Sequence, residues 1–294
     1  MLNLMSTLII SGRTAREALM PALMARIKAL SFVPQVAIIQ VGNRADSTAF
    51  IKVKKVFGEK IGVTVKEIHL KESVSESEVI EAIKECNADR NIRGIVVQLP
   101  LPISIDRDHV IEAIDPKKDV DALTPLAAKH WLEGREDAIF PATARGVREL
   151  LEYYKISLAG KHVVVVGRSM LVGKPIAVIA ENESATVTVC HSKTADLMSE
   201  TRQADVLIVA AGRPKLITID HVKEGAVVVD VGINTVKGEK LEDEIVGRKL
   251  VGDVDFEAVR DITSAITPVP GGVGPMTVLA LFENLVDLCL SPKR

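Results

Sequence analysis

The sequence is poor in aromatic residues, which make up 3% of its 294 positions, and no block of basic residues stands out. Proteins that track nucleic acids use stacking aromatic rings and clustered Lys and Arg side chains. The net charge is −2 and 47% of the residues are hydrophobic, which is the composition of a soluble globular protein. We therefore expect no nucleic-acid partner.

Cysteine is scarce as well. The three cysteines, Cys86, Cys190 and Cys289, lie far apart and form no CxxC motif. This fits a reducing compartment and argues against a disulfide framework. The six histidines show neither HExxH nor HxxxH spacing. The sequence therefore predicts no metal site.

Long hydrophobic runs are also missing. No run approaches the roughly 18 apolar residues that a membrane-spanning helix requires. The apolar opening at residues 1–5 lacks the basic region and the cleavage site of a signal peptide. We expect a cytoplasmic protein that does not contact a membrane.

Strands and helices alternate in the first part of the chain. An apolar run at 36–41, closed by Gly42, is typical of a strand buried on both faces. There follow a helical pattern at about 47–61, a strand at 63–70, a helix with a Ser75–Glu78 capping box and a strand at 94–99. This alternation predicts a parallel sheet with helices on its faces.

A second α/β unit begins near Phe140. Apolar strands are predicted at 162–166, 186–189, 205–210 and 226–230, and helical segments separate the first three. This pattern is typical of a Rossmann-like doubly wound sheet. The helix from 276 to about 288 follows the completed sheet and is expected to return to the first domain.

These elements predict an α/β protein of two domains. The first is an N-terminal parallel-sheet catalytic domain of residues 1–140, to which 271–294 return, and the second is a Rossmann-like domain of residues 141–270. The chain would then cross between the domains twice, and the ligand cleft would lie between them.

Residues 267–277 (TPVPGGVGPMT) hold three prolines and three glycines, so they form neither a strand nor a helix interior. The prolines fix φ, and the glycines allow close approach of another group. A stiff loop with few side chains suits a surface that lies flat against a planar ligand. A purely structural connection is the alternative.

Lys54 is the first candidate catalytic residue. It lies close to Ser47, within a helical apolar stripe that consists of Phe50, Val53, Phe57 and Ile61. An ammonium there either extends along its own stem to solvent or faces a cleft. In a cleft, desolvation lowers the lysine pKa and makes the amine usable as a general acid–base. The residues alone leave both interpretations open.

Polar residues follow at two further places. Gln98 ends an apolar strand, at the edge where open α/β sheets bind ligands, and Pro100 and Pro102 stiffen the loop behind it. A cap on the last hydrogen bonds of the strand is the alternative. Asp119 and Asp121 point to one side of an extended segment. They either bind N–H groups of a ligand or cap the next segment, and the residues alone favour the cap.

The nucleotide signal lies at 166–175 (VGRSMLVGKP). A strand enters a glycine turn, and a helix begins near 172–174, where backbone N–H groups and the helix dipole receive a pyrophosphate. The spacing is neither GxGxxG nor GxxxxGK[ST], and Pro175 replaces the hydroxyl residue of a P-loop. The strand–turn–helix context favours dinucleotide binding over a structural turn.

The end of the next strand indicates which dinucleotide. An NAD site has Asp or Glu about 20 residues further on, for the ribose hydroxyl. This chain has CHSKT at 190–194 and no acid. Arg168, Ser192 and Lys193 are suited to surround a 2′-phosphate, which favours NADP. An ordinary polar loop is the alternative.

Together and in this order, these motifs resemble those of the bifunctional methylenetetrahydrofolate dehydrogenase/methenyltetrahydrofolate cyclohydrolase family, over nearly the whole chain. The strongest are GIVVQLPLP (94–102), KDVD (118–121), VGRSMLVG (166–173), DVGIN (230–234) and TPVPGGVGPMT (267–277). The resemblance implies NADP-linked oxidation of 5,10-methylenetetrahydrofolate and hydrolysis of the methenyl product to 10-formyltetrahydrofolate. It also implies a folate-binding first domain and a homodimer that pairs through the Rossmann domains.

The resemblance further implies residue roles. Lys54 is expected to be the cyclohydrolase lysine, Gln98 the glutamine that tunes it, and Asp121 the carboxylate that anchors the pterin. Arg168 and Ser192 are expected at the 2′-phosphate. The expected substrate contacts are Ser47, Phe50, Leu99, Pro100, Pro270, Gly271 and Gly272. The expected cofactor contacts are Thr143, Gly167, Arg168, Ser169, Val172, Ser192, Ile233, Gly274 and Thr277.

Four positions depart from the family pattern. Phe50 stands where the family usually has tyrosine, Ala122 where a DVDG pattern has glycine, and Ala142 and Ala144 within a PCTP-like stretch. Ala122 matters only if its position needs a positive φ. These departures leave two alternatives open: a dehydrogenase with weak or absent cyclohydrolase activity, and a non-catalytic homologue that binds folate or nucleotide.

Overall fold

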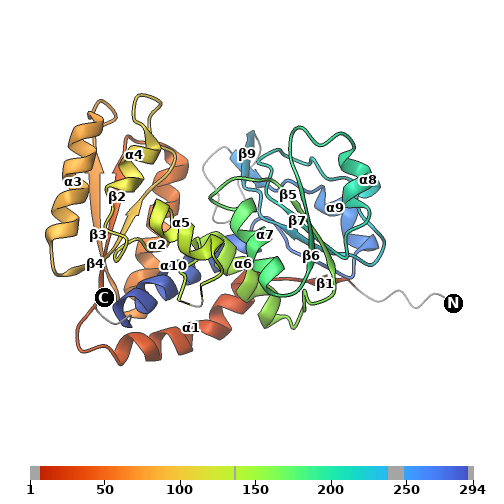
Figure 1. Ribbon diagram of the computed structural model, residues 1–294, viewed down its shortest axis with the longest axis horizontal. Helices are drawn as coiled ribbons and strands as arrows, with labels where there is room; N and C mark the ends of the chain where they lie inside the picture. The colour runs from red at the N-terminus through yellow and green to blue at the C-terminus, as the bar shows by residue number, and fades with distance from the viewer. Residues whose placement is uncertain (1–6, 136, 238–247, 291–294) are drawn as a thin grey trace. The chain divides into compact units, whose positions relative to one another are not determined.

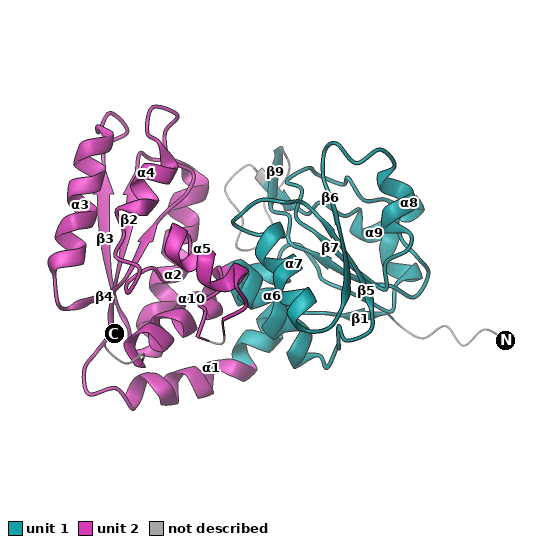
Figure 2. Ribbon diagram, viewed as in Figure 1, with its two compact units in different colours: residues 1–17, 143–277 teal, residues 18–142, 278–294 magenta. Residues whose placement is uncertain are grey.

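The computed structural model describes residues 7–135, 137–237 and 248–290 of the chain. The chain forms two compact units (Figure 2). Unit 1 comprises residues 1–17 and 143–277, and unit 2 comprises residues 18–142 and 278–294.

Unit 2 is built on a three-stranded parallel sheet in the order β3 (Thr64–Leu70), β2 (Gln35–Val41), β4 (Ile92–Val97) (Figure 1). Six of the seven residues of the central strand β2 are buried, as a continuous apolar run predicts. The helices of this unit are α1 (Gly12–Lys28, which begins in unit 1), α2 (Ala45–Ile61), α3 (Glu76–Ala88), α4 (Arg107–Glu112) and α5 (Pro125–Leu132). The predicted parallel sheet is confirmed.

The capping box of α3 forms as predicted. The backbone N–H of Glu78 donates to the Ser75 hydroxyl at 3.3 Å, and the backbone N–H of Ser75 donates to the Glu78 carboxylate at 2.9 Å. Two N–H groups that the helix itself leaves without a partner are satisfied in this way.

Helix α10 (Val273–Leu290) closes the described chain, and from Val278 onward it belongs to unit 2. The predicted return of this helix is thereby confirmed. The Phe282 ring packs on Phe57 of α2, with 5.7 Å between the ring centroids. By length and composition alone, with a mean hydropathy of 1.5, α10 could cross a membrane, but 56% of it is buried inside the protein, as in a core helix.

The buried side chain of Asn284 connects α10 to two loops of unit 2. Its amide nitrogen Nδ2 donates to the carbonyl oxygens of Val120 at 2.8 Å and Phe140 at 3.0 Å. We expect Asn284→Ala to lower the free energy of unfolding by about 1–3 kcal/mol, because buried carbonyls lose a donor. Urea unfolding measures this loss. Leu290→Ala, at a position 57% exposed, is the control and should change stability by less than about 0.5 kcal/mol. Equal effects of the two substitutions would contradict the prediction.

Unit 1 is built on a six-stranded parallel sheet in the order β1-β11-β8-β7-β5-β6. The predicted strands are β5 (His162–Val166), β6 (Thr186–Cys190), β7 (Val206–Val209) and β8 (Val227–Asp230). After β5 the chain runs outward to β6 and then returns to the other side of β5 with β7. Open α/β sheets bind ligands at the carboxyl ends of the strands where the order reverses in this way.

Smaller elements complete unit 1. The strands β9 (Asn234–Lys237) and β10 (Arg248–Val251) form an antiparallel pair. The helices are α6 (Ala142–Tyr153), α7 (Gly173–Asn182), α8 (Leu197–Thr201) and α9 (Phe256–Val259).

The start of the chain differs from the predicted division at residue 140. Strand β1 (Leu8–Ile9) pairs with β11 (Ala265–Ile266), which itself pairs with β8, so residues 1–17 belong with unit 1. The chain therefore changes unit three times, at 17/18, 142/143 and 277/278, where two crossings were expected. Both added strands have only two residues, which is too short for a hydrophobic period to be visible in the sequence.

Candidate active site and nucleotide-binding site

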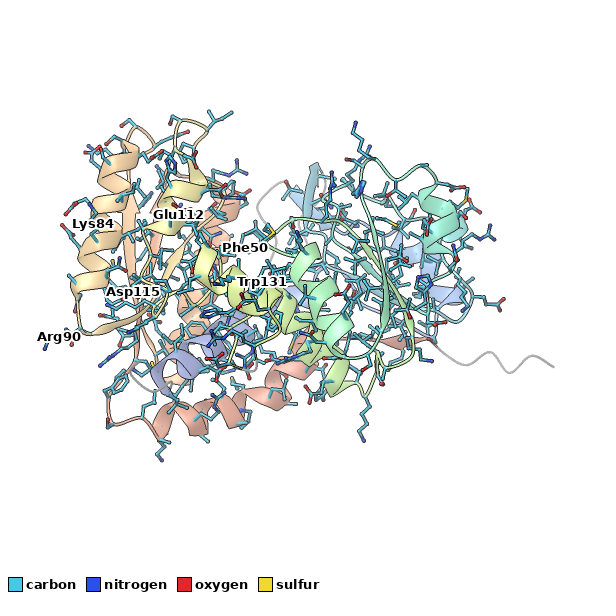
Figure 3. All side chains as sticks on the ribbon, viewed as in Figure 1. Phe50, Lys84, Arg90, Glu112, Asp115 and Trp131 are labelled. Carbon is cyan, nitrogen blue, oxygen red and sulfur yellow. The ribbon has the colours of Figure 1, made fainter. Side chains whose placement is uncertain are left out.

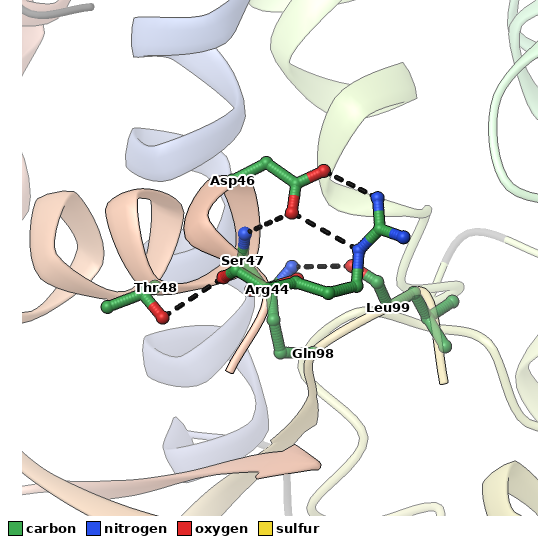
Figure 4. Close-up of polar contacts among 6 residues, drawn as sticks. All are labelled: Arg44, Asp46, Ser47, Thr48, Gln98 and Leu99. Carbon is green, nitrogen blue, oxygen red and sulfur yellow. Dashed lines mark hydrogen bonds and ion pairs between the residues drawn. The ribbon is translucent and has the colours of Figure 1, made fainter. Parts of the chain in front are cut away.

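Lys54 lies on α2 and contacts Gln98, which follows strand β4 of the three-stranded sheet of unit 2. Its ammonium nitrogen Nζ donates to Oε1 of Gln98 at 3.0 Å. The Gln98 amide nitrogen Nε2 donates in turn to the carbonyl oxygen of Leu99 at 2.9 Å (Figure 4). Because the NH₂ group of Gln98 is engaged with Leu99, its carbonyl oxygen faces Lys54. The two residues, 44 positions apart, are brought together as the resemblance to the family implies.

Burial and charge act together on Lys54. Burial of its amine lowers the Lys54 pKa, and the Asp121 carboxylate opposes that shift. Burial raises the Asp121 pKa, and the positive charge of Lys54 opposes that shift as well. Each group is therefore easier to convert to its neutral form than an exposed lysine or aspartate. Shifts in these directions are typical of groups that take part in proton transfer.

The neighbouring Asp119 has a structural role. It is buried, and its carboxylate accepts a hydrogen bond from the backbone N–H of Thr124 at 2.7 Å. Thr124 is the N-cap of α5. The capping interpretation is thus confirmed for Asp119, whereas Asp121, two positions further on, faces the charge of Lys54.

Ala122 follows Asp121 with a φ of 53° and is 1% exposed. A left-handed conformation costs a residue with a side chain about 1–2 kcal/mol. Burial of the methyl group returns roughly 0.8 kcal/mol, and alanine avoids about 0.5–1 kcal/mol of the entropy that glycine loses on folding. These terms nearly cancel, so alanine is tolerated where the family pattern has glycine.

The first two turns of α2 carry two expected substrate contacts, Ser47 and Phe50. Ser47 is buried, and its backbone N–H donates to Asp46 at 2.8 Å, while Arg44 pairs with Asp46 at 2.7 Å (Figure 4). Phe50, labelled in Figure 3, is 39% exposed although it is a large apolar residue. Leu99 and Pro100 follow Gln98 and are joined by a cis peptide bond.

The glycine turn after β5 is closely packed. The N–H of Gly167 donates to the carbonyl oxygen of Cys190 at 2.8 Å. A Cβ on Gly167, whose φ is 130°, would come within 2.3 Å of the Ala210 carbonyl oxygen. A Cβ on Gly173 would come within 2.2 Å of the Gly167 carbonyl oxygen. Helix α7 begins at Gly173, as predicted. Only glycine allows this turn and this approach of helix to strand.

Ser169 and Val172 lie inside the turn. The Ser169 hydroxyl accepts from the N–H of Val172 at 3.2 Å, and the Ser169 carbonyl accepts from the N–H of Lys174 at 3.0 Å. Val172 is the N-cap of α7 and provides no side-chain cap. The turn therefore holds its own shape, partly through the Ser169 hydroxyl, whereas no hydrogen bond within the turn uses the exposed side chain of Arg168.

Arg168 and Ser192 follow two neighbouring strands whose last residues, Val166 and Cys190, are in register. Both side chains are exposed. The loop after β6 is held by its own contacts, in which the N–H of His191 donates to the Thr194 hydroxyl at 2.9 Å. The adjacent strand ends carry Arg168 and Ser192 at the same edge of the sheet.

The remaining expected cofactor residues form two pairs within unit 1. The hydroxyls of Thr143 and Thr277 lie 3.4 Å apart. A Cβ on Gly274 would lie 4.0 Å from Cδ1 of Ile233.

Three expected substrate residues, Pro270, Gly271 and Gly272, belong to unit 1, whereas Lys54 and Gln98 belong to unit 2. The Gly271 carbonyl accepts from the N–H groups of Gly12 at 2.9 Å and Arg13 at 3.3 Å.

Two buried carboxylates of unit 1, Asp230 and Asp253, were not among the expected site residues. Asp230 was visible only as the first residue of the DVGIN motif, and Asp253 carried no signal. Their role depends on contacts between distant loops, which no local pattern shows.

Comparison with known proteins places the chain in a family. Residues 10–121 match the catalytic domain of tetrahydrofolate dehydrogenase/cyclohydrolase, and residues 141–292 match its NAD(P)-binding domain. The bifunctional protein FolD of Exiguobacterium sibiricum is 48% identical over 263 residues, 90% of this chain and 91% of that protein.

Solved structures agree with this assignment. The FolD enzyme of Campylobacter jejuni is 42% identical, with a TM-score of 0.89 over 96% of this chain and 98% of that one. The Trypanosoma brucei enzyme, solved with NADP and an inhibitor, is 34% identical, with a TM-score of 0.90 over 96% of this chain and 97% of that one. The resemblance noted in the sequence is confirmed. The chain belongs to the bifunctional methylenetetrahydrofolate dehydrogenase/cyclohydrolase family and is an NAD(P)-binding enzyme with both activities.

Proposed function

We propose that the chain uses NADP to oxidise 5,10-methylenetetrahydrofolate and uses Lys54 to hydrolyse the methenyl product to 10-formyltetrahydrofolate. The observation that carries the proposal is the 3.0 Å hydrogen bond from Lys54 to Gln98, next to the charge of Asp121. These three side chains form the site for proton transfer.

Hydrolysis moves both protons of the attacking water. Water adds to the methenyl carbon and gives up its first proton, which the neutral amine of Lys54 accepts. The carbon–N5 bond then breaks as the Lys54 ammonium returns this proton to N5, and the hydroxyl proton of the intermediate leaves to solvent, which gives the formyl group on N10. The lowered pKa of Lys54 makes its neutral amine more accessible than that of an exposed lysine. Gln98 fixes the direction in which the Lys54 amine points. Asp121 stabilises the Lys54 ammonium, and its carboxylate accepts hydrogen bonds from N–H groups of the pterin.

The oxidation step needs no strong protein base, because the lone pair of a folate nitrogen expels the hydride. The bound cofactor supplies the hydride acceptor. The protein holds the methylene carbon in position for the transfer. The Gly271–Gly272 loop and the pairs Thr143–Thr277 and Ile233–Gly274 are assigned to this positioning.

The residues of unit 1 fit a dinucleotide with a 2′-phosphate. The Gly167–Gly173 turn leaves no room for side chains between strand and helix, which suits close approach of a pyrophosphate. Arg168 and Ser192 provide a guanidinium and a hydroxyl at adjacent strand ends, and the 191–194 loop contains no acid that would repel a phosphate. This arrangement supports NADP over NAD.

We further propose a cytoplasmic homodimer that pairs through the Rossmann-like units. Cys86 and Cys190 are buried free thiols and Cys289 is a half-buried one, which supports a reducing compartment. The dimer itself rests on the resemblance to the family. Sedimentation equilibrium tests it, and a monomer at micromolar concentration would refute it.

The test of the whole proposal is a spectroscopic assay with methylenetetrahydrofolate and each nicotinamide cofactor, which follows reduced cofactor and methenyl product together. We expect reduction of NADP, with little methenyl product accumulating. Failure to reduce either cofactor would leave a binding protein without turnover.

Phe50 favours a second candidate function, a dehydrogenase with slow cyclohydrolase. Phe50 lies one helical turn before Lys54 and lacks the hydroxyl of the family's tyrosine, so Lys54 has one hydrogen-bonding neighbour fewer. Phe50→Tyr should then raise the methenyl hydrolysis rate by up to about tenfold, the value of one hydrogen bond. Loss of methenyl absorbance, without cofactor, measures this rate. The dehydrogenase rate serves as the internal control, and an unchanged hydrolysis rate would exclude this role for Phe50.

A further inference from the structure

Two buried carboxylates hold three loops of unit 1 at the carboxyl edge of its sheet. Asp253 accepts hydrogen bonds from three consecutive backbone N–H groups, those of Ala211 at 2.7 Å, Gly212 at 2.8 Å and Arg213 at 2.8 Å. Its Oδ1 also accepts from the side-chain amide of Asn234 at 2.8 Å. Asp253 is fully buried, so these four bonds satisfy a charge that water does not reach.

Asp230 holds the next loops in the same way. Its carboxylate accepts from the N–H groups of Gly232 at 2.9 Å, Asp253 at 3.0 Å and Val254 at 2.9 Å. A Cβ on Gly232 would lie 2.3 Å from Cγ of Asp253, and one on Gly252 would lie 1.8 Å from Oδ2 of Asp230. The backbone therefore closes directly on both carboxylates.

These contacts extend to the nucleotide turn. The loop that Asp253 holds begins at Ala210, whose carbonyl oxygen is the atom that leaves no space for a side chain at Gly167. The N–H of Ala210 donates to the Val166 carbonyl at 2.8 Å, immediately before that turn. The loop that Asp230 holds carries Ile233, whose Cδ1 would lie 4.0 Å from a Cβ on Gly274.

We propose that Asp253 and Asp230 are positioning residues for cofactor binding. The inference rests on the proposed cofactor site. Neither carboxylate is assigned a contact with the cofactor. They act through the 210–213 and 231–234 loops and the Gly167 turn.

The surroundings of Asp230 make its charge sensitive to pH. Burial raises the Asp230 pKa to about 7, and the Asp253 carboxylate that faces it acts in the same direction. The N–H groups of Val254, Asp253 and Gly232 lower the pKa, and the Asp230 backbone N–H donates to the Thr267 hydroxyl. The ordered loops therefore hold a proton on Asp230 more tightly than a water-exposed aspartate does, so this group supports the loops below about pH 7 and its support weakens as pH rises through that value.

The experiment compares Asp253→Asn and Asp230→Asn with the wild-type protein. Each variant should raise the KM for NADP about tenfold or more, since hydrogen bonds to a charged group are lost. The rate of methenyl hydrolysis, whose proton-transfer residues Lys54, Gln98 and Asp121 lie in unit 2, should stay within about twofold. Asp220→Asn, at an exposed position, is the matched control and should change neither quantity. Unchanged KM values in both variants would overturn the inference.

If the wild-type protein uses NAD and not NADP, the proposal of NADP as cofactor fails, but the positioning role of Asp253 and Asp230 does not. The KM for NAD of the same two variants then tests that role.

Hydrogen exchange of the wild-type amides of Ala211, Gly212 and Arg213 tests the inference without substitution. After correction for the intrinsic pH effect, protection of these amides should rise from about pH 8 to about pH 6, because the ordered loops hold the Asp230 proton more tightly than opened loops do. Protection that stays constant or falls would contradict the contribution of Asp230 to these loops.

Discussion

Lys54→Met is expected to lower the rate of methenyl hydrolysis by about 10²–10⁴-fold, the usual contribution of a positioned acid–base group. Methionine keeps the length and apolar character of the side chain and removes the amine that donates to Gln98. Loss of methenyl absorbance, measured without cofactor, gives the rate directly. Reduction of NADP should persist, because that step uses no proton from Lys54.

The matched control is Lys55→Met on the same helix. Lys55 pairs with Glu67 at 3.9 Å, and its side chain is 44% exposed, so its removal should leave both activities unchanged. Hydrolysis at the wild-type rate in Lys54→Met would show that Lys54 has no catalytic role. Equal loss of both activities would indicate damage to the fold.

The sign of the Lys54 pKa shift predicts that the variant stays folded. Burial lowers the folded-state pKa of Lys54 below its ordinary value of 10.5. The charged form is thus disfavoured by folding, and this cost is present at neutral pH and disappears as pH rises to the unfolded value. Methionine removes the cost. Asp121 loses the positive charge that lowers its pKa, and it then takes up a proton more readily.

Local patterns predicted the elements whose cause is local. The β2 apolar run and the Ser75–Glu78 box involve residues close in sequence, and both form as expected. Strands β1 and β11 did not appear in the prediction, because two residues show no period. Their pairing depends on residues more than 250 positions apart.

The helix of Lys54 shows what periodicity leaves undecided. Phe57 and Ile61 of its apolar stripe are buried, but Phe50 is 39% exposed and Val53 is 46% exposed. The amino-terminal half of the stripe is therefore no core face, and exposed apolar side chains beside a buried amine suit a ligand. A helical period identifies a shared face and does not tell which faces pack on the protein itself.

The hydrogen bonds to the Asp253 carboxylate could not be predicted from a sequence pattern, for a related reason. Its partners lie 19 to 42 positions away, and most of them are backbone N–H groups, which every residue but proline has. Which of these groups converge is decided by the return of three loops to one edge of the sheet. The Lys54–Gln98 contact also spans distant positions, and the resemblance to a family, rather than spacing, pointed to it.

Arg168→Ala is expected to weaken NADP binding by about 10- to 100-fold, because a charge-assisted pair of hydrogen bonds to the 2′-phosphate is lost. NAD lacks this phosphate, so its affinity should change by less than about twofold. Isothermal titration calorimetry measures the affinities for NADP and NAD on the same protein. The ratio of NADP affinity to NAD affinity, rather than either affinity alone, reports the contact between Arg168 and the 2′-phosphate.

The control for Arg168→Ala is Lys161→Ala. Lys161 is exposed and precedes β5, at the opposite end of the strand from Arg168, so the two substitutions remove the same charge from one element. Since long-range charge effects are screened beyond about 10 Å in ordinary salt, Lys161→Ala should leave the affinity ratio unchanged. An equal loss of NADP and NAD affinity in Arg168→Ala would show that Arg168 supports the turn as a whole. Discrimination would then have to come from Ser192 and Lys193, whose double substitution should abolish it.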